Sequence, residues 1–372
     1  MSGVPNVIGM ISNLFRAADE GTRTAASICL GNLSVGNPDF FLEKVFKLVD
    51  AADHTTKYLF LNTIREIILH NPKCLGPFIP KLLPLLLEQS KNVDEQIRGI
   101  VAENLGRLFV FYSMEMSAQL ESSFKSASPL ERATVTKSFK FAVAKDANQL
   151  DLQVFAEYLA KMSTDADINV RRCALESLTA VTHVHPGAVR EDSARILSSS
   201  LQLTKIDPSL IKEVDLGPFK HKQDDGIPIR KAAFALIDTM LERLPERVDA
   251  SLVAETAIKG IDDPAEECML QSVAIVHRLA QYSPTIVVNH IEPLLEAFGK
   301  QFVKNLANVD KNEKAKNVMR SVIRVVEQLH RAHEVEGNPK FADFFREKIS
   351  DSPVAREIFQ NLAASAARGL EL

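Results

Sequence analysis

A short motif recurs along this chain and constrains its fold more than any other feature. In each copy, a polar turn that carries Asp is followed by Ile or Val, then Arg, then small residues and an apolar stretch. The clearest copies begin at Asp94, Asp167 and Asp225. Asp is a favoured N-cap residue, so each copy predicts the start of the second helix of a pair. Small residues one turn later would let paired helices approach closely, and we expect the Arg to join adjacent turns through their carboxylates.

The spacing of the motif is that of a helical repeat. Arg98, Arg132 and Arg171 are 34 and 39 residues apart, as in families built from helix pairs. Elsewhere apolar residues recur at steps of three and four, with Gly and Pro between the stretches, which predicts helices almost throughout. A TPR array is disfavoured because the chain has no Trp. The sequence therefore predicts an all-α fold, a right-handed α-solenoid of about eight HEAT-type helix pairs, with residues 1–372 as a single array.

The two ends of the predicted array differ from its middle. A first helix expected at 4–15 is apolar from its start and has no polar capping repeat before it, as in a cut through a longer array. Near the other end, shorter helices are expected at 341–349 and 353–362. Together these would form a C-terminal cap over residues 341–364.

Composition argues against several classes of function. Lys and Arg total 44 against 48 Asp and Glu, giving a net charge of −4, and no long basic run is present to neutralise a nucleic acid. Apolar runs are short and the N-terminus has no signal pattern, so neither a membrane partner nor secretion is expected. The four cysteines form no zinc or redox motif, which favours a reduced, intracellular setting.

The case for an enzyme is weak. No phosphate-loop, dinucleotide-binding, metalloprotease or nucleophile-elbow pattern is found. Cys29, Cys173 and Cys268 lie among small and apolar residues of predicted second helices, and we interpret them as packing residues rather than nucleophiles. The Asp pairs at 224–225 and 262–263 precede predicted helices and are interpreted as caps. We therefore expect no catalytic residue, no cofactor and no bound metal.

One interval breaks the repeat. Arg171 and Arg230 are 59 residues apart, which is too long for one helix pair and too short for two. The extra residues, roughly 203–225, change from a helical to an alternating pattern on either side of Gly217 and Pro218. This change predicts an inserted β-hairpin.

The predicted hairpin has a single register that suits both of its faces. A two-residue turn at 217–218 would pair position 216 with 219, 215 with 220, 214 with 221 and 213 with 222. We expect the hairpin to protrude and enter a partner's groove, since burying one Phe contributes about 1.5–3 kcal/mol. In the alternative, the segment folds back over its own solenoid. The apolar face would carry Val214, Leu216, Phe219 and His221, and the charged face would pair Asp215 with Lys220 and Glu213 with Lys222.

The hairpin and the repeat together resemble a known family. The stretch LGPFKH at 216–221, followed by DDG at 224–226 and IRKAAF at 229–234, closely resembles a stretch in the C-terminal region of the cullin-associated, neddylation-dissociated family. Residues 101–106 and 169–175 are also similar to that family. Its members are longer HEAT-repeat proteins, and this chain resembles their C-terminal third.

The resemblance implies a function as well as a fold. The family wraps around cullin scaffolds of ubiquitin ligases that lack the ubiquitin-like modifier, and it exchanges their substrate receptors. The chain would then be a non-catalytic, monomeric module of the cytoplasm and nucleus that binds the N-terminal region of an unmodified cullin with its RING subunit. Its hairpin would compete with the receptor adaptor. The partner-binding residues that the resemblance implies are Lys212, Val214, Leu216, Gly217, Pro218, Phe219, Lys220 and His221.

Another HEAT-repeat scaffold or a transport receptor with a different protein partner is the alternative. A transport receptor would be expected to carry an acidic loop, which this chain lacks, and a phosphatase scaffold would keep a period of about 39 residues throughout. The chain departs from the family pattern at Lys222 and Gln223, at Pro228, and in the connection over 298–316. No cullin contact is inferred for that connection.

Overall fold

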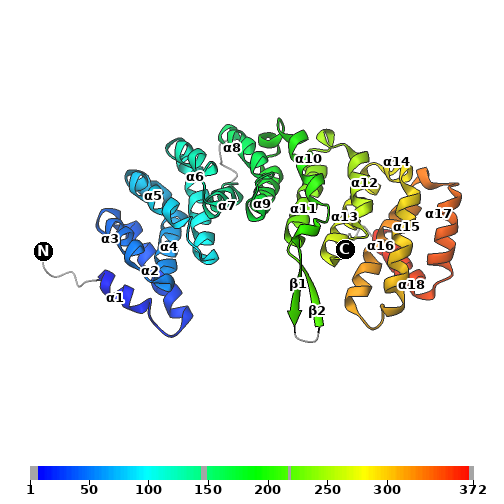
Figure 1. Cartoon of the computed structure of the whole chain (residues 1–372), viewed down its shortest axis with the longest axis horizontal. Helices are drawn as coiled ribbons and strands as arrows, with labels where there is room; N and C mark the ends of the chain where they lie inside the picture. Colours follow the sequence, from blue (N-terminus) through cyan, green and yellow to red (C-terminus); the bar gives the residue numbers. More distant parts are fainter. Residues whose placement is uncertain (1–6, 144–148, 217–218, 368–372) are drawn as a thin grey trace. The chain divides into compact units, whose positions relative to one another are not determined.

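The computed structural model describes residues 7–143, 149–216 and 219–367 (Figure 1). Contacts divide the chain into two compact units, Met1–Asp192 (unit 1) and Ser193–Leu372 (unit 2), and each is described by itself. The described residues form α-helices, short 3₁₀ helices, one π-helical turn and one two-stranded antiparallel sheet, which lies in unit 2. The predicted all-α fold with one inserted hairpin is confirmed.

Unit 1 is built from helices that follow one another in antiparallel steps. Short 3₁₀ helices precede or follow several of them, as at Pro72–Phe78, Phe139–Phe141 and Pro186–Val189. The helices are α1 (Val7–Leu14), α2 (Glu20–Gly36), α3 (Pro38–Ala51), α4 (His54–His70), α5 (Ile79–Gln89), α6 (Glu95–Phe124), α7 (Pro129–Ser138), α8 (Gln149–Met162) and α9 (Ile168–Val184).

Unit 2 continues the alternation and contains the hairpin. The helices expected at 341–349 and 353–362 are found as α17, a following π-helical turn and a longer α18. The elements are α10 (Ser193–Leu203), β1 (Ile211–Leu216), β2 (Phe219–Asp224), α11 (Ile227–Arg243), α12 (Ala250–Gly260), α13 (Glu266–Tyr282), α14 (Pro284–Asn289), α15 (Ile291–Asn305), α16 (Glu313–His330), α17 (Pro339–Phe344) and α18 (Pro353–Ala367).

The second helices of successive pairs pack on one another and form the spine of each unit. In unit 1 these are α2, α4, α6, α7 and α9, and in unit 2 they are α11, α13, α16 and α18. Helix α6 takes part in two pairs because it is kinked at Tyr112, where the backbone leaves helical geometry (φ −134°, ψ 35°). The Tyr112 hydroxyl donates a 2.8 Å hydrogen bond to the Pro72 carbonyl, which holds the kink against the preceding 3₁₀ helix.

Asp side chains cap the second helices at two of the three predicted places. Asp94 accepts hydrogen bonds from the amides of Gln96 and Ile97 at 2.7 and 3.0 Å, and Asp167 caps α9 in the same way. The prediction for Asp225 is wrong, because the N-cap of α11 is Gly226 and no side chain caps that helix. Asp225 is instead bound at the base of the hairpin.

Close approach between helices occurs between second helices of neighbouring pairs. A Cβ atom on Gly106 of α6 would lie 2.0 Å from the backbone oxygen of Ser138, at the end of α7. Buried polar side chains join other second helices: Asn104 of α6 donates to the Leu61 carbonyl of α4 at 3.0 Å, and Ser177 of α9 donates to the Thr136 carbonyl of α7 at 2.8 Å. These contacts fix the stacking of successive pairs.

Gly106→Ala is therefore expected to lower the free energy of unfolding by about 1–3 kcal/mol, because the added methyl group must displace backbone. Gly99→Ala is the matched control on the same helix, since a Cβ there meets nothing within 4 Å. That change is expected to raise stability by about 0.5–1 kcal/mol through helix propensity. Urea unfolding followed by circular dichroism measures both, and a Gly106→Ala protein as stable as Gly99→Ala would contradict the packing described here.

Candidate partner-binding hairpin

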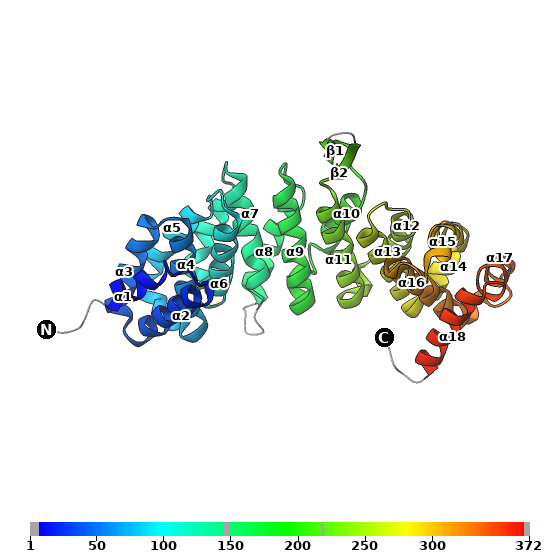
Figure 2. The same ribbon diagram turned by 90° about the horizontal axis from the view of Figure 1, so that it is seen from below.

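The hairpin has the register that the sequence predicts. Leu216 pairs with Phe219, Asp215 with Lys220, Val214 with His221 and Glu213 with Lys222. Within unit 2, β1 and β2 extend away from α10 and α11 in both views (Figures 1 and 2). Gly217 and Pro218 lie outside the described residues, and so do the side chains of 214–221. The register places the predicted apolar residues on one face, because directly paired residues of an antiparallel ladder share a face.

The base of the hairpin is closed by Asp225. Its carboxylate accepts a 2.6 Å bond from the Lys212 ammonium and a 2.9 Å bond from the Gln223 amide, and its backbone N–H donates to the Leu210 carbonyl at 3.0 Å. The hydrogen bonds from Lys212 and Gln223 lower the pKa of this carboxyl below its ordinary value. Lys212, one of the predicted partner-binding residues, is thus bound within the chain, although two thirds of its side chain remains exposed.

A buried arginine connects the hairpin to the rest of unit 2. Arg230, on the first turn of α11, has a side chain only 1% exposed. Its Nε and Nη2 bind both carboxylate oxygens of Asp263, at 2.8 and 3.1 Å, and Nη2 also binds Asp224 of β2 at 2.9 Å. Burial disfavours the charged guanidinium, but the two carboxylates outweigh it and raise the pKa of Arg230. Asp224 and Asp263, interpreted from sequence as caps, are therefore ion-pair partners.

Unit 1 contains an equivalent ion pair, Arg132 with Asp165, in a repeat that has no hairpin. Arg132 binds Asp165 through Nε and Nη2, both at 2.9 Å, so the predicted bond between an Arg and the next turn is confirmed there and at Arg230. Burial raises the pKa of the Asp165 carboxyl, but bonds from Arg132 and the Asp167 amide bring it below its ordinary value. For Arg98 the prediction is wrong, because its guanidinium donates to the carbonyls of its own turn.

The sequence predicted the hairpin but not its anchor, the ion pairs of Arg230 with Asp224 and Asp263. The signal was the sequence DDG at 224–226, since it places Gly four residues before Arg230, where the other two clear copies of the motif have Asp94 and Asp167. Reading it as a cap overlooked that Gly226 itself occupies the cap position.

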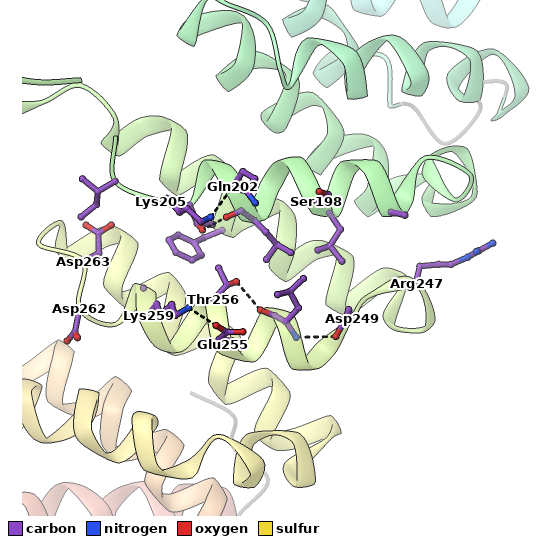
Figure 3. Close-up of a pocket in the computed structure, with 18 residues that line it drawn as sticks. Ser198, Gln202, Lys205, Arg247, Asp249, Glu255, Thr256, Lys259, Asp262 and Asp263 are labelled. Carbon is purple, nitrogen blue, oxygen red and sulfur yellow. Dashed lines mark hydrogen bonds and ion pairs between the residues drawn. The ribbon is translucent and has the colours of Figure 1, made fainter. Parts of the chain in front are cut away.

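A groove of about 730 Å³ lies between α10 and α12 of unit 2 (Figure 3). Its floor is apolar and includes the buried Leu201 and Phe234, while Ile206 and Leu252 line it with 43% and 44% of their surfaces exposed. Asp263 also lines the groove, which therefore adjoins the hairpin anchor. Its volume is within the range of ligand pockets. Sequence patterns could not reveal it, because its walls come from separate helix pairs.

Two of the three cysteines weighed as packing residues are buried. Burial raises the pKa of the Cys173 thiol to about 11, and burial together with the nearby Asp263 raises that of Cys268 to about 11. Both thiols are therefore protonated and poorly nucleophilic at neutral pH. Cys29 is exposed on α2, so its prediction as a packing residue is wrong.

The described residues hold neither a metal-binding cluster nor a membrane-spanning helix. No group of three or more His, Cys, Asp or Glu side chains that could hold a metal ion occurs in that part of the chain. In the same part, none of the helices combines the length and the apolar character needed to span a membrane.

Comparison with known proteins adds a family model and several relatives. The model described as "TATA-binding protein interacting (TIP20)" matches residues 188–348, which include the hairpin and its anchor. "Cullin-associated NEDD8-dissociated protein 1" of Dictyostelium discoideum is 31% identical over 364 residues, 95% of this chain and 29% of that protein. The mouse protein 2 of the same name is 30% identical over 356 residues, 94% of this chain and 29% of its own length.

Solved structures agree in fold alone. Kap121p bound to RanGTP superposes with a TM-score of 0.69 at 12% identity, over 97% of this chain and 38% of that one. Yeast importin-β (Kap95p) has a TM-score of 0.63 at 11% identity, over 97% of this chain and 46% of its own. Both likenesses support the helical-repeat architecture described above.

The relatives also agree with the resemblance to a C-terminal region. A relative named the C-terminal part of cullin-associated NEDD8-dissociated protein 1, from Emericella nidulans, is 26% identical over 327 residues, 86% of this chain and 31% of that protein. The chain spans about 29% of the length of the Dictyostelium and mouse relatives. Over nearly its whole length, the chain is therefore a homologue of the cullin-associated NEDD8-dissociated proteins.

Proposed function

We propose that this chain is a non-catalytic binding module for the N-terminal region of an unmodified cullin with its RING subunit, and that its hairpin contacts the cullin. The observation that carries the proposal is the hairpin itself, which has a unique register and lies inside the region matched by the family model. The names of the relatives supply the partner class. We further propose that the chain acts as a monomer in the cytoplasm and nucleus.

In the proposed contact, the tip of the hairpin inserts into the partner. Paired residues 216 and 219 flank the turn, so Leu216 and Phe219 are adjacent on one face by register. Apolar and aromatic residues at the centre of an interface carry most of its binding energy. A receptor adaptor whose site on the cullin overlaps the hairpin's cannot bind at the same time, and this exclusion would make the module an exchange factor rather than a passive scaffold.

Binding to the cullin is the direct test. The N-terminal region of an unmodified cullin, titrated with this chain by isothermal calorimetry, is expected to give saturable binding of one chain per cullin. A shortened variant, in which a Gly-Ser turn replaces residues 213–222, is the comparison. It keeps Lys212, Asp224 and Asp225 at the base of the hairpin and should lose most of that affinity. A cullin that does not bind the intact chain, or that binds the shortened one equally well, would reject the proposal.

A further inference from the structure

We propose that Arg230 is the positioning residue of the hairpin: through Asp224, its guanidinium fixes the end of β2 and so sets the direction in which the hairpin leaves unit 2. Its importance for partner binding rests on the proposed function, but the anchoring itself can be tested in the isolated protein. Arg230 differs from its counterparts Arg23, Arg98 and Arg132 in what its guanidinium binds.

In three other copies of the motif, the arginine binds the turn that precedes its own helix. The Nη1 atom of Arg23 donates to the carbonyls of residues 17 and 18 at 2.8 and 2.9 Å. Arg98 reaches the carbonyls of residues 92 and 93 at 2.7 and 2.8 Å, and Arg132 reaches those of residues 126 and 127 at 2.7 and 3.4 Å. Each arginine therefore closes a turn through carbonyls six and five positions before it.

At Arg230 the corresponding positions are Asp224 and Asp225, the end of the hairpin. The Nη1 atom of Arg230 is buried and donates to no carbonyl oxygen of the described residues. Instead, the Asp224 side chain binds Nη2 at 2.9 Å through one oxygen, and its other oxygen accepts the Gly226 amide at 2.8 Å. At Arg230, an ion pair to the side chain of β2 thus takes the place of the bonds to turn carbonyls that Arg23, Arg98 and Arg132 make.

This replacement is tightly packed. The Asp224 side chain is 16% exposed. A Cβ atom on Gly226 would lie 3.0 Å from the Asp224 carboxylate and 3.1 Å from Nη1 of Arg230. Gly226, between the hairpin and α11, therefore has little room for a side chain, because the Asp224 carboxylate and the Arg230 guanidinium lie against it.

The guanidinium is itself held from the other side. Asp263, in the turn between α12 and α13, is 3% exposed at its side chain and binds Arg230 with two bonds, as Asp165 binds Arg132. Charge-assisted bonds in such a desolvated site are strong and directional. The hairpin is therefore linked through one side chain to the next helix pair.

Anchoring of this kind matters for recognition because a two-stranded hairpin alone is marginally stable in water. A hairpin already held in its binding direction loses less conformational freedom when it docks, so affinity rises without any new contact. Arg230 and Asp224 would thus act on the partner without touching it.

Hydrogen exchange of the β2 amides in the isolated chain tests the anchor. Arg230→Ala would leave two buried carboxylates uncompensated, so the informative variants are Asp224→Asn, which keeps the shape, and Asp224→Ala, which removes every bond. The loss of a charge-assisted bond is expected to speed exchange of the β2 amides by about tenfold or more, with α11 and α13 little affected. Asp165→Asn is the control, because it removes the carboxylate that binds Arg132 as Asp263 binds Arg230, in a repeat without a hairpin, and it should leave β2 exchange unchanged.

The outcomes separate the anchor from the proposed function. Faster exchange in both Asp224 variants but not in Asp165→Asn supports the inference, and unchanged exchange in Asp224→Ala overturns it whatever the partner. The two Asp224 variants, whose β2 amides exchange faster, should also bind the cullin N-terminal region about tenfold more weakly than the wild-type chain. A wild-type chain that binds no cullin would reject the proposed function while leaving the exchange result to decide the anchor.

Discussion

Replacing Arg230 by Ala is expected to lower the free energy of unfolding of unit 2 by about 3–5 kcal/mol, because the substitution leaves charges buried without a partner. The guanidinium is 1% exposed and binds two carboxylates, whose side chains are 3% and 16% exposed. With the cation removed, Asp224 and Asp263 would face each other's charge in a site that water hardly reaches. Urea unfolding followed by circular dichroism, with intact-chain hydrogen exchange to assign the transition to unit 2, gives the measurement.

Arg98→Ala is the control for this prediction. Arg98 occupies the same position in its repeat, but its bonds go to the carbonyls of residues 92 and 93, and no buried carboxylate depends on it. Loss of such bonds costs about 0.5–1.5 kcal/mol each. Equal destabilisation by the two substitutions would show that the ion pairs at Arg230 add nothing beyond the closing of a turn.

The double substitution Leu216→Ala with Phe219→Ala is expected to weaken cullin binding by at least tenfold while leaving the helical signal and melting temperature nearly unchanged. Each side chain, once buried in a partner, contributes about 1.5–3 kcal/mol, so tenfold is a lower bound. The spine of unit 2 consists of α11, α13, α16 and α18, and the hairpin extends away from α11 (Figures 1 and 2), so the fold should not depend on its tip. Calorimetry and thermal denaturation measure the two effects separately.

A change on the other hairpin face serves as the control for the tip. Lys222 pairs with Glu213 on the predicted charged face, opposite the apolar one, and its side chain is exposed. Lys222→Ala should change affinity less than the double substitution does. Parallel loss of folding and binding in the double variant would show instead that the segment packs on its own helices.

The register of the hairpin could be predicted from the sequence, although its strands span 211–216 and 219–224 rather than the whole of 203–225, whereas its anchor could not. Alternation of side chains and a two-residue turn are local properties, and together they allow one pairing of 213–216 with 219–222. The same local reasoning assigned Asp94 and Asp167 correctly as caps. It failed at Asp225, because the hairpin changes what surrounds an otherwise regular motif, and the roles of Asp224 and Asp263 depend on a guanidinium supplied by another segment.

Features that arise from packing between helix pairs were also beyond the sequence. Gly106 resembles any helical glycine until α7 is placed 2.0 Å from where its Cβ would lie. Cys29 and Cys173 are each followed by one small and one apolar residue, yet the first is exposed and the second buried. The groove between α10 and α12 likewise exists only after α11 has brought Phe234 beneath both helices. Periodicity predicts which residues share a helix face, but not which face a neighbouring helix covers.

The most direct test of the account is a titration of this chain against an unmodified cullin N-terminal region, with and without the receptor adaptor already bound. If the hairpin occupies the adaptor's site, the chain binds the free cullin and its apparent affinity falls as adaptor is added, in the manner of competition for one site. Affinity that does not change with adaptor would contradict the competing role of the hairpin, even if the chain proves to bind the cullin elsewhere.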